Sequence, residues 1–246
     1  MKLKLFNIEL GQETKSAIFD RLETVLRQKK STEPFFLSTL NPEILLQAEK
    51  DFEYAKILNS TTLKINDGFG LQLLACFKKQ EIGQRLAGAD LAGWILQKTK
   101  ELGLRVGLAV NKNGLSSQQE IENYLKKQKV ENFVIFSQEK NFFLQNQVFP
   151  ADFLESEVLL VGLGAPEQEK FIFQAIQKRL FPNLKLAIGV GGTFDFWTKK
   201  QKRAPIFFQK MGLEWLWRLF FQPRRIFRIW RATAVFFWKG ISGYNS

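Results

Sequence analysis

The sequence predicts an α/β protein with a doubly wound, mostly parallel sheet of the Rossmann-like type, followed by a basic, aromatic-rich helical appendage. Short, unbroken apolar runs alternate with helical patterns up to residue 197, as a parallel sheet buried on both faces requires. Two of these runs, residues 158–161 and 184–188, lead directly into Gly-rich turns. Ligands of open α/β sheets bind at the carboxyl ends of the strands. We therefore expect a phosphate-bearing ligand at these turns, although ordinary tight turns explain either one alone.

The N-terminal half alternates strands and helices, and each element is marked by its residue pattern. Residues 2–9 alternate in polarity, as an edge strand does, and residues 14–30 place apolar side chains at helical spacing. Asn41 followed by Pro42 is a helix start, because Asn caps helices and Pro suits the first helical position. In chain order we expect an edge strand at 2–9, a helix at 14–30, strands at 35–40 and 62–65, and helices starting at 42 and near 71.

The remainder of the sheet domain continues the alternation. Asp90, which follows a loop at 84–90, and Ser117 are the expected N-caps of two helices, and Gly103 ends the first of them. Pro166 with acidic residues in the next turn marks another helix start. In chain order we expect helices at 90–103 and 117–129, strands at 104–110, 133–136 and 158–161, a helix at 166–180 and a strand at 184–188.

Composition narrows the chemistry. A chain of 246 residues can form one large or two small domains, and we divide it into a catalytic domain at 1–198 and an appendage at 199–246. It contains one cysteine and no histidine, which excludes an intrachain disulfide, a histidine-ligated metal and an imidazole base. Cys76 stands in an apolar run and is expected in the core. A general base must then be a carboxylate, Lys or Tyr, and we expect no metal and no cofactor.

The net charge of +12 is concentrated at the C-terminal end. From residue 199 onward the chain has 11 basic residues against one acidic residue, Glu214, so the first 198 residues carry only +2. Such a basic tail is expected to bind phosphate groups, either on nucleic acid or on an anionic membrane surface. The N-terminus lacks the long apolar region of a signal peptide, and no run reaches the roughly 18 uncharged apolar residues of a spanning helix. We expect a cytoplasmic protein, peripheral on the inner face of the membrane.

The tail begins with a charged segment, residues 199–205, which we expect to be a mobile hinge. On a helix drawn through residues 224–237, one face is basic and the opposite face is apolar. Arginine flanked by large aromatic side chains is typical of an interfacial membrane helix. A C-terminal helix packed on its own domain or on a second subunit, in a homo-oligomer, explains this segment equally well. The basic face carries Arg224, Arg228 and Arg231; the apolar face carries Ile226, Ile229, Trp230, Thr233 and Phe237.

Polar side chains at strand ends are the candidate functional residues. Asp67 follows a predicted strand, where a carboxylate can take a proton from an acceptor hydroxyl, although Asn-Asp-Gly is also good turn chemistry. Thr39 and Asn41 end a neighbouring strand and can bind a sugar or cap the next helix. Arg85 is a phosphate ligand or a solvated loop charge. Gln168 reaches a ligand from the first turn of its helix, or lies exposed.

Three common nucleotide-binding patterns are absent from the sequence. A dinucleotide fingerprint G-x-G-x-x-G would require glycine at Glu167 or at Phe194, so an NAD enzyme is disfavoured. No lysine follows either Gly-rich turn in the manner of a P-loop, which disfavours an ATPase of that class. The chain also lacks Asp-x-Asp, the metal-chelating pair of many nucleotide-sugar enzymes. Asp51-Phe52-Glu53 comes closest, but its expected place is late in a helix.

Short motifs spread from about residue 35 to 230 resemble the WecG/TagA/CpsF glycosyltransferases, glycosyltransferase family 26. Each motif is weak by itself, but the ordered set is specific and covers nearly the whole chain. The chain departs from the family pattern at Val110-Asn111-Lys112-Asn113-Gly114 and at Asn141-Phe142-Phe143, on the expected nucleotide side. The matching segments are Thr39-Leu40-Asn41-Pro42, Asn66-Asp67-Gly68, Arg85 to Asp90, Gly162 to Glu169, Gly189 to Phe196, Arg203-Ala204-Pro205, Leu213 to Arg218 and Pro223 to Arg228.

The resemblance implies a metal-independent, inverting transfer of an N-acetylmannosamine-type sugar from a UDP donor. The implied acceptor is N-acetylglucosamine on a polyprenyl diphosphate at the cytoplasmic membrane face, for cell-surface polysaccharide or teichoic acid synthesis. It also implies that Asp67 is the general base and that the basic tail works at the membrane, on the lipid diphosphate. We expect residues 206–238 to fold onto the body only at the membrane.

The resemblance and the strand-end positions together predict the site residues. We expect catalytic roles for Asp67, Thr39 and Asn41, and no nucleic acid among the partners. Two alternatives stay open at this point: a nucleic-acid-binding module, which basic charge and aromatic residues also fit, and a catalytically dead family member. Substrate contacts are expected from Asn66, Arg85, Gly162, Gly164, Gln168, Gly189, Gly191, Gly192, Asp195, Arg218, Arg225 and Arg228.

Overall fold

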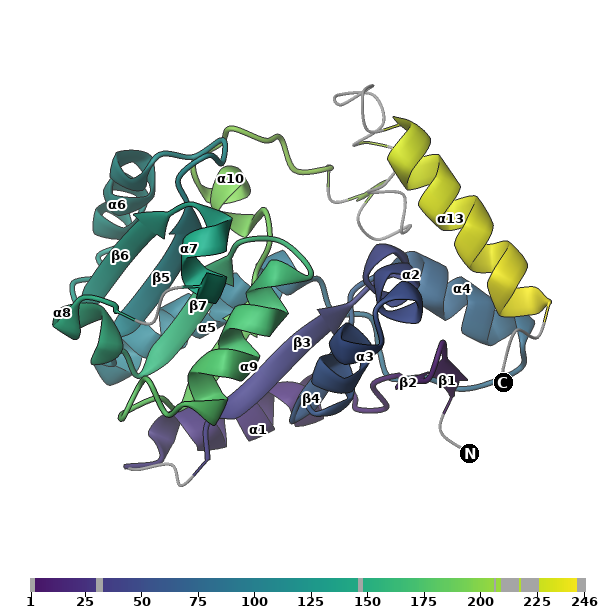
Figure 1. The fold of residues 1–246 in the computed structure, drawn as a ribbon, viewed down its shortest axis with the longest axis horizontal. Helices are drawn as coiled ribbons and strands as arrows, with labels where there is room; N and C mark the ends of the chain where they lie inside the picture. Colours follow the sequence, from purple (N-terminus) through teal and green to yellow (C-terminus); the bar gives the residue numbers. More distant parts are fainter. Residues whose placement is uncertain are drawn as a thin grey trace.

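A six-stranded, entirely parallel sheet forms the centre of the protein in the computed structural model (Figure 1). The structure describes residues 3–29, 33–145, 148–205, 207–208, 217 and 226–242. The parallel, doubly wound class expected from the apolar runs is confirmed. In spatial order the strands are β4 (Leu63–Asn66), β3 (Phe35–Leu40), β8 (Leu186–Gly189), β7 (Val158–Gly162), β5 (Val106–Asn111) and β6 (Phe133–Gln138).

Helices cover both faces of the sheet, and each face has its own hydrophobic core. Side chains alternate along each strand between the two cores, as in β7, where Val158 and Leu160 face one and Leu159 and Val161 the other. This double burial explains the unbroken apolar runs of the sequence. One face packs against α1 (Lys15–Arg27), α5 (Gly88–Leu102), α6 (Gln118–Lys127) and α10 (Thr193–Trp197); the other packs against α3 (Phe52–Asn59), α7 (Lys140–Gln145), α8 (Ala151–Leu154) and α9 (Glu167–Gln177).

A third core lies beyond the carboxyl end of β3. It joins α2 (Pro42–Lys50) and α4 (Phe69–Phe77) to the N-terminal segment and to α13 (Ile226–Ile241). The N-terminal residues form a small antiparallel pair, β1 (Lys4–Leu5) with β2 (Ile8–Glu9), so the expected edge strand at 2–9 is instead a separate two-stranded hairpin. Leu3, Leu5 and Ile8 are buried in this core. Their burial explains the alternation that the sequence shows.

Two of the predicted helix starts are confirmed by the capping hydrogen bonds of Asn41 and Ser117. The Asn41 side chain accepts from the Ile44 amide at 3.0 Å, and Ser117 forms a capping box with Glu120. Asp90 is an error of prediction, because α5 begins two residues earlier, at Gly88, after Ala87. The Gly88 amide finds its partner elsewhere, in the carboxylate of Asp67. The start of α5 is therefore bound to the end of β4.

Two further expectations are corrected. Cys76 is exposed, not in the core, because it lies on the outer side of α4, whose Leu71, Leu74 and Ala75 face inward. Asp51 does not fall late in a helix: it caps the start of α3 by accepting from the Tyr54 amide at 3.0 Å, and it ends α2. A capping role explains its place between two helices.

The beginning of the appendage is bound to the sheet domain. Lys200 pairs with Glu120 at 2.6 Å, and Arg203 pairs with Asp90 at 2.6 Å. The Gln201 amide donates to the Asp195 carbonyl at 3.0 Å, and Ala204 is 3% exposed. The prediction of a mobile hinge at 199–205 is therefore wrong.

Helix α13 packs against α2 and α4 (Figure 1). Phe236 is fully buried, and Lys239 pairs with Glu49 of α2 at 2.5 Å. Gly240 lies so close to Leu74 of α4 that a Cβ there would overlap its side chain. The expectation that the tail folds onto the body only at a membrane is wrong for this helix, since protein contacts hold it.

Candidate active site

A cavity of about 440 Å³ opens at the carboxyl ends of the strands. Its wall is formed by residues that end or follow β3, β4, β5, β7 and β8, together with the start of α5. Ligands of open α/β sheets bind at this edge. A larger hollow, about 710 Å³, lies on the opposite side of the fold, between α9 and residues that precede β3 and β4. That hollow is away from the strand ends, and its lining includes none of the predicted site residues.

The structure brings most of the predicted residues together in this cavity. The exceptions are Asn66 and Arg85, which do not line it, and the tail arginines. Arg218 and Arg225 lie outside the described residues, as does the side chain of Arg228. The predicted residues that line the cavity are Thr39, Asn41, Asp67, Gly162, Gly164, Gln168, Gly189, Gly191, Gly192 and Asp195.

The Asp67 carboxylate projects from the end of β4 toward the next loop. One carboxylate oxygen, Oδ2, accepts from the Gly88 amide at 3.1 Å. The backbone of the turn is held separately, because the amides of Asp67 and Gly68 both donate to the Leu40 carbonyl, at 2.8 and 3.3 Å. The turn explains the backbone of this motif, and the side chain is directed to the cavity wall. The backbone of the motif is thus a turn, while the Asp67 side chain lines the cavity.

Thr39 and Gly88 lie against Asp67. Thr39 is 7% exposed, and a Cβ placed on Gly88 would lie 3.2 Å from both the Thr39 methyl carbon and the Asp67 carboxylate. Glycine at position 88 thus allows β3, β4 and α5 to meet at one point of the wall. Asn41 follows on the same wall, but its Oδ1 atom is engaged in capping α2.

Asn66 does not reach the cavity. Its side chain is 2% exposed and points into the loops beside β4. The Asn66 amide nitrogen donates to the carbonyls of Gly11 and Gly83, at 2.9 and 3.0 Å, while its oxygen accepts from the Gly11 amide at 3.2 Å. These bonds join two distant loops and fix the strand that carries Asp67. The structure thus gives Asn66 a supporting position, in place of the expected substrate contact.

Arg85 lies behind the turn that carries Asp67. Its Nε atom donates to the Asp67 carbonyl at 3.1 Å. Its side chain is half-buried and outside the cavity lining. The hydrogen bond ties the loop 84–87 to the turn, so Arg85 braces the backbone next to the carboxylate.

The glycines that end β7 and β8 are needed by the protein's own packing. A Cβ on Gly162 would overlap the ring of Phe194, and a Cβ on Gly189 would lie 2.5 Å from Nε2 of Gln168. We expected substrate contacts from these glycines; both line the cavity, but protein side chains occupy the space where a Cβ would lie. Gly164 and Gly191 have positive φ angles, +80° and +51°, which the two turns require.

Gln168 is buried, not exposed, and joins two elements of the wall. Its Oε1 atom accepts from the Gly191 amide at 3.0 Å, and its Nε2 atom donates to Glu169 at 2.6 Å. Glu169 is fully buried and also accepts from the Tyr54 hydroxyl at 3.0 Å. Burial raises the pKa of Glu169 to about 7, and burial beside this carboxyl raises the pKa of Tyr54. This series of buried hydrogen bonds holds the turn after β8 through the Gly191 amide.

The start of α9 is a poorer anion site than the sequence suggested. Its first turn carries Glu167 and Glu169, whose negative charge already favours the positive end of the helix. The Gln168 amide donates to the Gly164 carbonyl at 3.0 Å. A phosphate at this helix end would approach these carboxylates.

Asp195 faces the cavity and also holds the neighbouring loops. Its Oδ1 atom accepts from the Ser116 hydroxyl at 2.7 Å, and its Oδ2 atom accepts from the side-chain amide of Gln201 at 3.3 Å. Ser116 is also 2.7 Å from the Thr198 hydroxyl. Asp195 therefore joins the loop after β5 to the beginning of the appendage.

Lys140 is a cavity residue that the sequence analysis missed. It starts α7, two residues after β6, and its Nζ atom lies 3.4 Å from Glu167. The strand-end position was a usable signal, but the predicted strand ended at Phe136. The charged residues that line the cavity, among those described, are Lys140 against Glu43, Asp67 and Asp195. Within the same part of the chain, no group of three or more potential metal ligands is found.

Comparison with known proteins agrees with this geometry. Residues 3–244 match the model of the Glycosyl transferase WecG/TagA/CpsF family. The chain belongs to this family. It is also 30% identical, over 193 residues, to an N-acetylglucosaminyldiphosphoundecaprenol N-acetyl-beta-D-mannosaminyltransferase of Bacillus subtilis (strain 168), a match that covers 77% of this chain and 72% of that protein. The resemblance predicted from the motifs is confirmed, and the family match favours a glycosyltransferase over a nucleic-acid-binding module.

Proposed function

We propose that this glycosyltransferase moves an N-acetylmannosamine-type sugar from a UDP donor to N-acetylglucosamine on a polyprenyl diphosphate, with inversion at the anomeric carbon. The Bacillus subtilis relative is named for a mannosaminyl transfer to a diphosphoundecaprenol-linked acceptor. The observation that carries the proposal is one cavity at the strand ends that contains Asp67 on one side and the β7 and β8 turns on the other.

Asp67 is the proposed general base. Its carboxylate takes the proton of the acceptor hydroxyl, and the hydroxyl oxygen forms a bond to the anomeric carbon. The bond from that carbon to the UDP oxygen breaks on the opposite face, and UDP leaves with the electron pair. The hydrogen bond from the Gly88 amide, 3.1 Å long, orients the carboxylate. Thr39, on the same wall, is placed to hold the acceptor sugar.

The donor is proposed to lie against the turns after β7 and β8. Gln168 holds the second turn through Gly191, and Lys140 is placed to meet a phosphate oxygen. Metal-independent loss of a diphosphate requires positive charge near the leaving oxygen. Since carboxylates outnumber the single lysine in the described lining, the tail arginines Arg218, Arg225 and Arg228 are the proposed source of the remaining charge.

The acceptor's lipid chain implies work at a membrane surface. None of the described helices is long and apolar enough to cross a bilayer. The basic tail, +10 from residue 199 onward, is the proposed means of attachment to an anionic leaflet. We propose that the protein acts as a peripheral protein on the cytoplasmic face.

Replacement of Asp67 by asparagine tests the base. Asp67→Asn preserves size and removes basicity, so we expect turnover to fall about 10²- to 10⁴-fold, with UDP-sugar binding and thermal stability little changed. Initial rates with a short-chain lipid-diphosphate N-acetylglucosamine measure turnover. Calorimetry measures donor binding and thermal stability. Asp20→Asn, the same exchange at an exposed position of α1, is the control. Wild-type turnover in Asp67→Asn would reduce Asp67 to a turn residue.

A further inference from the structure

An apolar surface that the functional site does not use lies on α4 and α13. Three large side chains of α4 are exposed at helical spacing: Phe69 at 37%, Leu73 at 47% and Phe77 at 66%. On α13, Trp238 and Ile241 are 64% and 49% exposed. Contiguous exposed side chains of this size mark an interaction site more often than isolated ones do. We call these five residues the α4–α13 patch.

The two exposed sets lie on the same side of the helix pair. Gly70 and Leu74 of α4 face α13, where they meet Phe237 and Gly240. At about 100° per residue, the exposed α4 side chains follow directly beside this contact line, on the side away from the buried face of α4.

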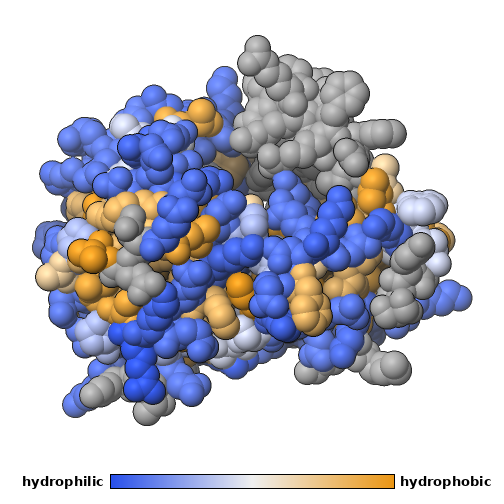
Figure 2. All heavy atoms as spheres, in the orientation of Figure 1, coloured by the Kyte–Doolittle hydropathy of each residue, from blue (hydrophilic) through white to orange (hydrophobic). Residues whose placement is uncertain are grey.

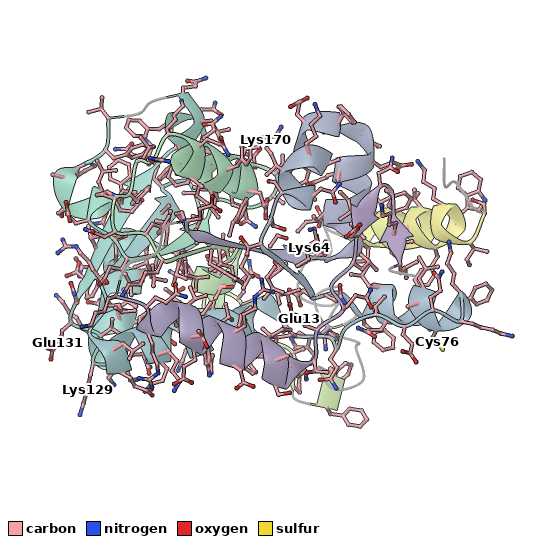
Figure 3. The ribbon with its side chains drawn as sticks, turned by 90° about the horizontal axis from the view of Figure 1, so that it is seen from below. Glu13, Lys64, Cys76, Lys129, Glu131 and Lys170 are labelled. Atoms are coloured by element: carbon pink, nitrogen blue, oxygen red, sulfur yellow. The ribbon has the colours of Figure 1, made fainter. Side chains whose placement is uncertain are left out.

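The positions of side chains around α13 follow from the same helical geometry. Phe236 and Lys239 face the body, and Phe237 and Gly240 face α4. At about 100° per residue, Ile241 and Trp238 come next around the helix, beyond the α4 side. Figures 1 and 3 both place α4 and α13 side by side at one end of the molecule. The patch is therefore one surface contributed by two helices that are far apart in the sequence.

The charged residues of the two helical segments favour one kind of partner. Residues 69–80 contain Lys78 and Lys79 and no acidic residue, and residues 226–242 contain Arg228, Arg231 and Lys239 and no acidic residue. The chain has 24 acidic residues, all outside these two segments. Exposed apolar side chains with a tryptophan, on two helical segments whose charged residues are all basic, fit the interface of an anionic bilayer. Apolar side chains also gather over α8 and the β6 edge, among hydrophilic ones (Figure 2).

We propose that α4, together with the outer side of α13, lies on the surface of an anionic lipid bilayer, with Phe69, Leu73 and Phe77 inserted among the acyl chains. Helix α4 begins two residues after Asp67, so contact of α4 with lipid places the cavity at headgroup level. This consequence rests on the proposed function, because a lipid-linked diphosphate lies at that level. The basic tail by itself attracts the protein to the membrane, whereas α4 sets its orientation.

Cys76 makes the proposal measurable in the full chain. It is the single cysteine of the sequence, it is exposed, and it lies on α4 between Leu73 and Phe77. In Figure 3 its sulfur points away from α13. An environment-sensitive dye on Cys76 is expected to shift to the blue with phosphatidylglycerol-containing vesicles and to be quenched by spin-labelled lipids. The control is Cys76→Ser with Phe52→Cys, a site on α3 that is 72% exposed. An unchanged Cys76 dye on vesicle-bound protein would overturn the proposal.

A charge-matched pair of variants tests the same surface by sedimentation with vesicles. Leu73→Glu with Phe77→Glu is expected to lower vesicle partitioning at least about tenfold, because two apolar contacts are lost. Phe52→Glu with Val148→Glu makes the same charge change at other exposed sites and is expected to bind within about twofold of wild type. Equal losses in both pairs would show that charge alone governs binding and would overturn the role of α4.

Two further outcomes separate this inference from its rivals. If light scattering without lipid shows a dimer that the α4 pair dissociates, and vesicle binding is unaffected, the patch joins two copies of the chain and the proposal falls. Transfer to a short-chain soluble acceptor is expected to be the same in the α4 pair as in wild type, while transfer to a long-chain acceptor in vesicles declines. If wild type transfers no sugar at all, the proposed function fails, and the vesicle and dye results still decide the inference.

Discussion

The carboxyl group of Glu169 is fully buried and accepts a hydrogen bond from Gln168, which lines the cavity. Burial raises its pKa to about 7 from the usual 4.5, so the folded protein holds this proton more tightly than the unfolded chain does. Its contribution to stability is therefore greatest below pH 4.5 and is lost as the pH rises to about 7. A shift of this size corresponds to a loss on the order of 3 kcal/mol.

Glu169→Gln keeps the shape of the protonated side chain and cannot titrate. We expect the difference in unfolding free energy between wild type and Glu169→Gln to change by a few kcal/mol between about pH 4.5 and 8. Wild type becomes less stable relative to the variant as the pH rises. Urea titrations at several pH values measure it. Tyr54→Phe removes a hydrogen bond that favours the carboxylate and should extend the loss to higher pH. A pH-independent difference would contradict the assigned pKa.

Gly189 and Gly192 lie in the same turn region but have different neighbours. A Cβ on Gly189 would lie 2.5 Å from Gln168, whereas the nearest atom to a Cβ on Gly192 is 3.6 Å away. We expect Gly189→Ala to cost about 1–3 kcal/mol by overpacking and to weaken donor binding, because Gln168 must move. Gly192→Ala is the control for stability and should leave the melting temperature unchanged. Thermal melts and donor titrations compare them; equal stability of the two variants would refute the packing role of Gly189.

At the residue scale, the sequence predicted positions better than roles. Asp67, Thr39 and Gln168 were found because strand ends can be read from apolar runs. Asn66 and Arg85 do not line the cavity, and Gly162 lines it but also packs against Phe194. Their partners Gly11, the Asp67 carbonyl and Phe194 come from other parts of the chain or from backbone. Such long-range contacts leave no local pattern in one sequence.

Two glycines in helices differ in what surrounds them. Gly240 of α13 is pressed against Leu74 of α4, while a Cβ on Gly93 of α5 would meet open space. We expect Gly240→Ala to loosen α13 and to speed amide hydrogen exchange in α13 and α4. Gly93→Ala should instead stabilise the protein by about 0.4–1 kcal/mol, because it reduces the freedom of the unfolded chain. Unchanged exchange in Gly240→Ala would mean that α13 is not held by close contact with α4.

At the scale of elements, prediction succeeded where the pattern is set by burial. Strands β3, β5, β7 and β8 lie within a residue or two of their expected bounds, because both faces of each are covered. The hairpin at 4–9 and the start of α5 were not predicted. The hairpin depends on a third core to which α13 contributes, and the start of α5 depends on a bond from Asp67.

At the scale of the whole molecule, the cavity, the appendage and the α4–α13 patch are connected. Asp67 follows β4 at the cavity, and α4 of the patch begins two residues later. Asp195 and Asp90 join the start of the appendage to the cavity rim and to α5. Contact of one end of the molecule with a bilayer would thus determine how a lipid-linked sugar meets Asp67.

Transfer itself is the most direct test of the account. Purified protein is incubated with a panel of UDP-sugars and a short-chain lipid-diphosphate N-acetylglucosamine, with and without a metal chelator, and the products are identified by mass and by anomeric configuration. We predict one N-acetylhexosamine added from UDP-N-acetylmannosamine, with inverted configuration, equal rates in chelator, and loss of the product in Asp67→Asn. Absence of any lipid-linked disaccharide across the panel, from protein that is folded and binds vesicles, would contradict the account.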